Sequence, residues 1–91
     1  MITEYMDICL FCGRKKQDVH HCVFGTANRK LSDADGLTVP VCREHHELLH
    51  KNDKISKVIG QLAYERDRCA EGKTIEKARE MFVDRYGKNY L

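Results

Sequence analysis

The chain has 91 residues, a charged fraction of 33% and a net charge of only +2. A chain of this length forms one small domain that buries only about 60–65% of the surface exposed on unfolding, so a bound metal would add useful stability. The small net charge does not indicate a nucleic-acid partner, and no apolar run is long enough to span a membrane. The odd number of cysteines and an acidic start without a leader pattern predict a reducing cytoplasm, where Cys with His indicates a metal site more often than a disulfide.

The first half of the chain is expected to form a ββα unit. Cys9-Leu10-Phe11-Cys12-Gly13 is a Cys-x2-Cys knuckle, in which the glycine allows a tight return of the backbone. Residues 19–24 and 37–41 are rich in β-branched residues and are predicted strands, and Pro40, which has no backbone donor, places the second at a sheet edge. We expect a long loop over residues 25–36 and a helix over residues 42–50.

Two more helices are predicted after this unit. Asn52-Asp53 offers a cap for a helix that continues to Ala70 or Glu71, where Gly72 is a stop signal. Thr74 would cap a last helix that ends at Gly87. Packing is the simplest explanation of the apolar residues that recur at helical spacing in both segments, which are Ile55, Val58, Ile59, Leu62, Ala63, Ile75, Ala78, Phe82 and Tyr86.

Two knuckle-like pairs predict a structural zinc site. Cys9 and Cys12 are followed by Cys42 and His45, which together supply four ligands suited to tetrahedral Zn²⁺. Buried free thiols are the simpler alternative, and His46 is an alternative fourth ligand. The other two cysteines are expected to be structural. Cys22 should lie in the core and Cys69 should be half-buried on the third helix.

The helix over residues 42–50 is predicted to serve a second metal. On a helix, Cys42 and His45 share one face, whereas His46 and His50 lie one turn apart on a neighbouring face. His20 and His21 are adjacent on a predicted strand and would point to opposite sides, so one core and one solvent histidine is the simpler explanation of that pair alone. The two unexplained histidines on the helix favour a joint site instead.

The pattern Cys-x2-Cys, then His-His, then Cys-x2-His-His-x3-His resembles the HNH (ββα-metal, His-Me finger) endonucleases, and more narrowly the small HNH proteins of bacteriophages. The likeness covers residues 9–50, and Phe24-Gly25, Gly36-Leu37 and the ending at residues 86–91 extend it. It implies an α+β fold, with a zinc-stapled ββα-metal core over residues 9–50 and a helical extension over residues 53–91, in one domain spanning residues 1–91.

The resemblance also implies residue roles. His21 matches the general base that takes a proton from water, and His20, His46 and His50 match the ligands of a catalytic divalent ion (Mg²⁺, Mn²⁺, Ni²⁺ or Zn²⁺). An imidazole has an unperturbed pKa near 6.5, which suits a base near neutral pH. The implied activity is hydrolysis of phosphodiester bonds in double-stranded DNA within a bacterial host cell, with a phage or host protein as a further partner.

One position departs from the family pattern. The family's middle Asn should fall near Gly36-Leu37, where the chain has none. Asn28 is our candidate for a bracing role beside the catalytic histidine, and Asp35 lies in the same segment. Arg29 and Lys30 are the predicted nucleic-acid contacts, and Lys51, Lys54 and Lys57 extend the basic residues. The alternative function is a zinc-stapled DNA- or protein-binding module of a phage recombination or packaging assembly, without catalysis.

Overall fold

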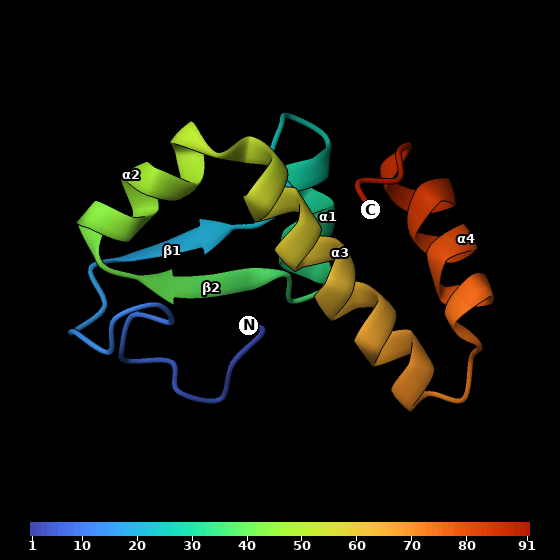
Figure 1. Ribbon diagram of the computed structural model, residues 1–91, viewed down its shortest axis with the longest axis horizontal. Helices are drawn as coiled ribbons and strands as arrows, with labels where there is room; N and C mark the ends of the chain where they lie inside the picture. The colour runs from blue at the N-terminus through green and yellow to red at the C-terminus, as the bar shows by residue number, and fades with distance from the viewer.

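An antiparallel hairpin and the helix that follows it organise the first half of the chain. The computed structural model describes residues 1–91 and contains, in order, β1 (Asp18–His21), α1 (Asn28–Ala34), β2 (Thr38–Val41), α2 (Arg43–Lys51), α3 (Asp53–Ala70) and α4 (Ile75–Tyr86). β1 pairs with β2 in a two-stranded sheet, with His20 opposite Val39 and His21 opposite Thr38. The predicted α+β class is thus confirmed, and Figure 1 shows α2 lying along the hairpin while α3 leads away to α4.

The segment predicted as a loop over residues 25–36 contains a helix, α1. Its anchor is Ser32, whose buried hydroxyl donates to the carbonyl of Val23 at 2.7 Å and accepts from the amide of Val23 at 3.2 Å. Because a side chain satisfies both polar backbone groups of Val23, this residue does not need a strand partner. The first strand therefore ends at His21 and not at Phe24 as predicted.

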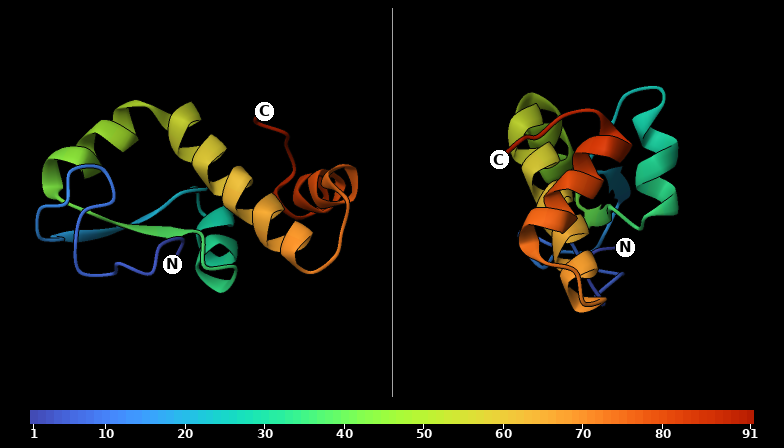
Figure 2. Two further views of the ribbon diagram at one scale, coloured as in Figure 1. Left: turned by 60° about the horizontal axis from the view of Figure 1, so that its bottom comes forward. Right: turned by 90° about the vertical axis from the view of Figure 1, so that its right-hand side faces the viewer.

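Two apolar clusters form the core. One lies between the hairpin, the N-terminal knuckle and α2, and contains Cys9, Cys22, Val39, Val41, Cys42 and Leu49. The other joins the end of β1 to the helical pair and contains Val23, Leu37, Ala63, Tyr64, Phe82 and Tyr86. Cys22 is buried as predicted. Figure 2 shows α3 spanning the molecule from the hairpin to α4.

The inward face of α3 mixes polar and apolar residues, and the predicted apolar stripe is only partly correct, since Ala63 is buried and Ile59 packs against the core. Ser56, Gly60, Gln61 and Glu65 are buried, whereas Ile55 and Leu62 are more than half exposed. Gly60 allows a close approach, since a Cβ there would lie 2.8 Å from Val23 Cγ2. The hydrogen bonds of the polar groups, described below, make this burial possible.

The helix ends follow the predicted signals with one exception, and two residues of the helices differ from their predicted burial. The Thr74 hydroxyl accepts from the amide of Lys77 at 3.2 Å, and Gly87 ends α4 in the left-handed conformation. The side chain of Asn52, by contrast, does not cap α3 but donates to the carbonyl of Leu48 at 2.8 Å. Ile75 is 52% exposed, and Cys69 is exposed where we predicted a half-buried thiol. None of the helices combines the length and the apolar character that crossing a membrane requires.

Candidate metal centres

The N-terminal knuckle and the start of α2 bring Cys9, Cys12, Cys42 and His45 together, with their ligand atoms all within 4.8 Å of one another. The Cys12 and Cys42 sulfurs are 3.8 Å apart, and His45 Nδ1 lies 3.7 Å from Cys9 Sγ and 3.2 Å from Cys42 Sγ. Four ligands around tetrahedral zinc, with Zn–S near 2.3 Å and Zn–N near 2.0 Å, would be separated by about 3.5–3.8 Å. This cluster could therefore hold a structural metal such as zinc, and His45 occupies the fourth position.

The charge beside Cys12 suits a thiolate ligand. The backbone N–H of Arg14, followed by its guanidinium, lowers the pKa of Cys12 to about 6. Arg14 Nε donates to Cys12 Sγ at 3.3 Å, and its Nη2 donates to Glu44 at 2.9 Å. Three thiolates around Zn²⁺ would carry a formal charge near −1, which the Arg14 guanidinium offsets. The pair Arg14–Glu44 also ties the knuckle to the first turn of α2.

A second group, on the other side of α2, consists of His20, His46 and His50, whose candidate ligand nitrogens again lie within 4.8 Å of one another. His46 Nε2 and His50 Nε2 are 3.1 Å apart, close to the roughly 3.3 Å expected for two nitrogens on one tetrahedral ion. Burial, followed by the neighbouring histidines His50, His46 and His21, lowers the pKa of His20 to about 4. His20 is thus a neutral imidazole at neutral pH, the form that binds metal.

Residues behind these imidazoles fix which nitrogen faces the group. The Ser56 hydroxyl donates to the carbonyl of Cys22 at 2.7 Å, so it can only accept from His20 Nε2, which is also 2.7 Å away. That hydrogen bond leaves Nδ1 of His20 as the free ligand atom. Asp18 Oδ2 lies 3.1 Å from His46 Nδ1, which favours a proton on that nitrogen and a lone pair on Nε2. Such outer partners are a regular feature of histidine metal sites.

The residue predicted as the base lies beside this group. His21 borders a hollow of about 190 Å³ together with His20, His46, His50, Phe24 and Arg29. Its Nε2 lies 3.4 Å from Asp33 Oδ1, on α1. The pairing with an acidic oxygen favours a proton on Nε2 and leaves Nδ1 of His21 as the basic nitrogen. His21 and Arg29 also border a second hollow of about 440 Å³, whose other lining residues are Thr26, Lys30 and Asp33.

The structure brings most, but not all, of the predicted site residues together. Arg29 and Lys30 line hollows that include His21. Asn28 begins α1 and lines neither hollow. Asp35 turns to the other side and accepts hydrogen bonds of 2.6 Å from Arg85 and from the Tyr86 hydroxyl. Neither of the two bracing candidates contacts His21, and Asp33 does.

Sequence reasoning missed three supporting residues, Asp18, Asp33 and Ser56. Asp18 directly precedes the strand segment with the two histidines, so its presence near them could have been anticipated. Asp33 follows Arg29 by four residues, and the two share a helix face only once residues 28–34 are known to be helical. Ser56 carried no signal, because a serine within a helix gives no indication of a partner 36 residues away.

A family model described as "Protein of unknown function (DUF968)" matches residues 4–64. That range includes every member of the cysteine cluster and of the histidine cluster as well as Ser56, and it ends before the last helix. Searches of curated proteins and of solved structures gave no significant match.

Proposed function

The chain belongs to the DUF968 family of proteins of unknown function, and from its two clusters we propose that it is a metal-dependent HNH-type endonuclease that hydrolyses DNA phosphodiester bonds. The observation that carries the proposal is the convergence of His20, His46 and His50 beside His21 in one hollow. Three imidazoles would leave a divalent ion with its full charge and with positions open to substrate, in contrast to the four-ligand cluster, which would be closed.

The architecture supports this assignment. The histidine pair lies on β1 and the ligand pair lies on α2, which packs on the hairpin that β1 forms with β2 (Figure 1). α2 presents His45 to the cysteine cluster and His46 to the histidine cluster, since adjacent helix positions differ by about 100°. The cysteine cluster would act as a structural staple, and the histidine cluster would be the working site.

The proposed roles follow from the positions of the side chains. When bound, a divalent ion at this site would stabilise negative charge that develops on a phosphodiester group. His21 would accept the proton of the attacking water at Nδ1, while Asp33 holds its opposite nitrogen. Arg29, which borders both hollows, would contact a neighbouring phosphate. Asp33 would thus supply the orienting contact for which the chain has no Asn near Gly36.

Elemental analysis combined with a plasmid assay tests this proposal. We expect two metal ions per chain in the wild type and one in the double variant His46→Ala/His50→Ala. His21→Ala is the matched control, because it should keep both ions and the fold and yet lose cleavage in Mg²⁺, Mn²⁺, Ni²⁺ or Zn²⁺. A wild-type protein that holds one ion per chain and cuts no plasmid would refute the proposed endonuclease function.

One observation favours the alternative of a non-catalytic binding module. The position where HNH endonucleases have their middle Asn is glycine followed by leucine, and Asn28 lies outside the hollow. A module of this kind would bind a single zinc ion at the cysteine cluster. Its binding to DNA or to a protein would then be unchanged by His21→Ala.

A further inference from the structure

A third hollow, lined by lysines, lies next to the histidine site. It measures about 440 Å³ and lies between the start of α3 and the C-terminal segment, with lining residues Asp53, Lys54, Lys57, Lys88, Asn89, Tyr90 and Leu91. None of its three lysines forms an ion pair within the chain, although Asp53 lines the same hollow. These ammonium groups are therefore available to an external anion.

Aromatic rings connect this hollow to the histidine cluster. The Phe24 ring lies 5.3 Å from that of His50 and 5.9 Å from that of His20. Lys57 Nζ lies 5.1 Å from the centre of the Phe24 ring and 5.6 Å from that of Tyr90. Within the C-terminal segment, Lys88 Nζ lies 5.5 Å from the centre of the Tyr90 ring. The Phe24 ring thus lies between Lys57, which lines the hollow, and His50, which is a candidate metal ligand.

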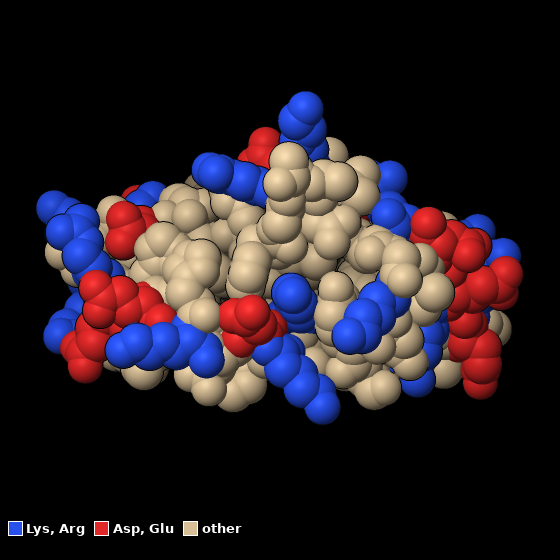
Figure 3. All heavy atoms as spheres, turned by 90° about the horizontal axis from the view of Figure 1, so that it is seen from above, with Lys and Arg blue, Asp and Glu red and all other residues tan.

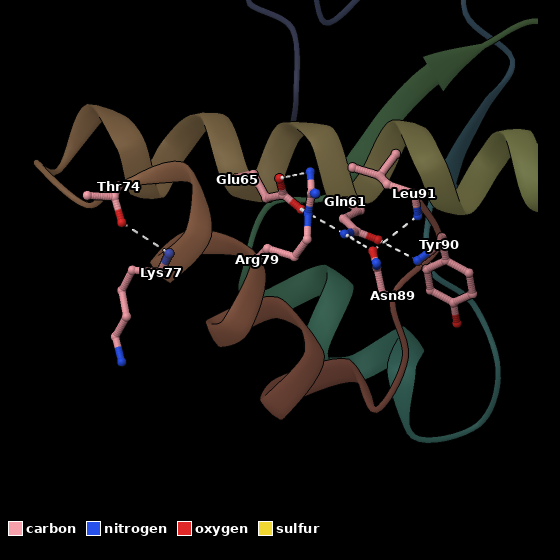
Figure 4. Close-up of polar contacts among 8 residues, drawn as sticks. All are labelled: Gln61, Glu65, Thr74, Lys77, Arg79, Asn89, Tyr90 and Leu91. Carbon is pink, nitrogen blue, oxygen red and sulfur yellow. Dashed lines mark hydrogen bonds and ion pairs between the residues drawn. The ribbon is translucent and has the colours of Figure 1, made fainter.

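The chain uses buried polar groups to hold the C-terminal segment in this place. Gln61 is fully buried, and its side chain donates to Asn89 Oδ1 at 2.8 Å and accepts from the amide of Tyr90 at 2.8 Å. The same Gln61 amide donates to Glu65 at 2.7 Å, and Arg79 pairs with Glu65 at 3.1 Å (Figure 4). Buried polar groups are costly unless all are bonded, so this network gives a short surface segment a fixed position.

We propose that the lysine hollow is a subsite for the phosphate backbone of a nucleic acid, next to the proposed cleavage site. Its ligand class rests on the proposed function, whereas its charge and fixed geometry do not. Lysine ammonium groups bind phosphates as point charges, and a strand rises about 3.4 Å per nucleotide, so a few nucleotides would reach from the histidines to Lys88. Figure 3 shows Lys and Arg side chains near the middle of this face, with most acidic side chains towards its two ends.

The test measures binding of a fluorescent DNA duplex, and of one of its strands, to Lys57→Gln/Lys88→Gln. The matched control is Lys73→Gln/Lys77→Gln, which loses the same charge. Lys73 lies in the turn between α3 and α4, and Lys77 lies in the first turn of α4, as Figure 4 shows. All measurements use the His21→Ala background, so that the DNA stays intact. Loss of two phosphate contacts should lower the slope of log K against log salt by about 1.8 for the duplex. The control should retain the slope of the parent, and thermal melting verifies folding.

The outcomes separate this inference from the proposed enzyme. Equal losses in both double variants, or no loss in either, would overturn the subsite, even if the wild type cuts plasmid. A loss confined to Lys57→Gln/Lys88→Gln supports the subsite, even if the wild type cuts nothing. A wild-type protein that binds neither duplex nor single strand would also overturn it. So would equal competition by polyglutamate of the same charge, which would indicate a general anion site.

Discussion

Removing the Ser56 hydroxyl should weaken the histidine metal site while leaving the cysteine cluster intact. In Ser56→Ala, His20 Nε2 loses its acceptor and the carbonyl of Cys22 loses a donor, both at 2.7 Å. Each lost hydrogen bond has a net value of about 1 kcal/mol, and alanine returns about 0.5 kcal/mol of helix propensity. We therefore expect about 1.5 kcal/mol of lost stability without metal.

The larger effect should be on metal binding. Without Ser56, neither nitrogen of His20 is held in a fixed direction, and loss of such an outer partner lowers metal affinity by about 10–100-fold. Competition of Zn²⁺ or Co²⁺ with a chromophoric chelator would measure the affinity of the second, weaker ion. The affinity of the first ion should not change, because the Ser56 hydroxyl hydrogen-bonds to none of the four residues of the cysteine cluster.

Ser32→Ala is the matched control for this experiment. Its hydroxyl is equally buried and also makes two hydrogen bonds, both to Val23, but it does not contact a histidine. The two variants should lose similar stability, and only Ser56→Ala should lose metal affinity. Equal second-ion affinity in both variants would refute the idea that Ser56 sets the ligand nitrogen of His20.

Three other predictions concern the fold. Cys42→Ser, or a strong chelator, should unfold the chain, because structural zinc contributes about 10–16 kcal/mol in finger peptides and whole domains are stable by only about 5–15 kcal/mol; an unchanged circular dichroism melt would contradict this. Burial, followed by the hydrogen bond to Asp35, raises the pKa of Tyr86 above its usual 10. As the pH rises, the unfolded chain then releases this proton before the folded chain does. The urea concentration at the unfolding midpoint should therefore decrease as the pH rises above 10, and it should decrease less steeply with pH in Tyr86→Phe. Equal slopes of the urea midpoint against pH in the two proteins would refute the assignment. Gly60→Ala should lose about 1 kcal/mol net despite better helix propensity, because its Cβ would lie 2.8 Å from Val23 Cγ2; a raised melting temperature would show that α3 can move away.

The parts of the fold that the sequence predicted depend on local signals. Thr74 and Gly87 mark the ends of α4 through contacts within one turn. The spacing of the pairs Cys9/Cys12 and Cys42/His45 was enough to predict that they form one cluster. The helix over residues 42–50 could be predicted for the same reason. Its two ligand faces followed from helix geometry, without knowledge of what lies opposite.

The parts that sequence reasoning missed depend on partners distant in the chain. α1 has no apolar stripe, and its buried residue is Ser32, which is meaningful only because Val23 lies against it. Reading that segment as a loop hid the direction of Asp33 and left Asn28 as the natural bracing candidate. On α3 the apolar residues Ile55 and Leu62 suggested the inward face, but they point outward. Hydrogen-bond partners of Ser56, Gln61 and Glu65, together with the apolar contacts of Ala63 and Tyr64, determine which side of α3 is buried.

The polar inner side of α3 limits how this helix can be positioned. A helix with an apolar inner face can shift by a turn or rotate slightly and still bury a similar area. Ser56 and Gln61, by contrast, find hydrogen-bond partners at only one position of α3 relative to its neighbours. Gly60 likewise fits only where Val23 approaches. A sliding movement of one turn would leave Glu65 in the interior without Arg79, which is costly. The hydrogen bonds of α3 therefore permit one alignment of this helix, and the spacing between His20 and the lysines of the hollow is fixed along with it.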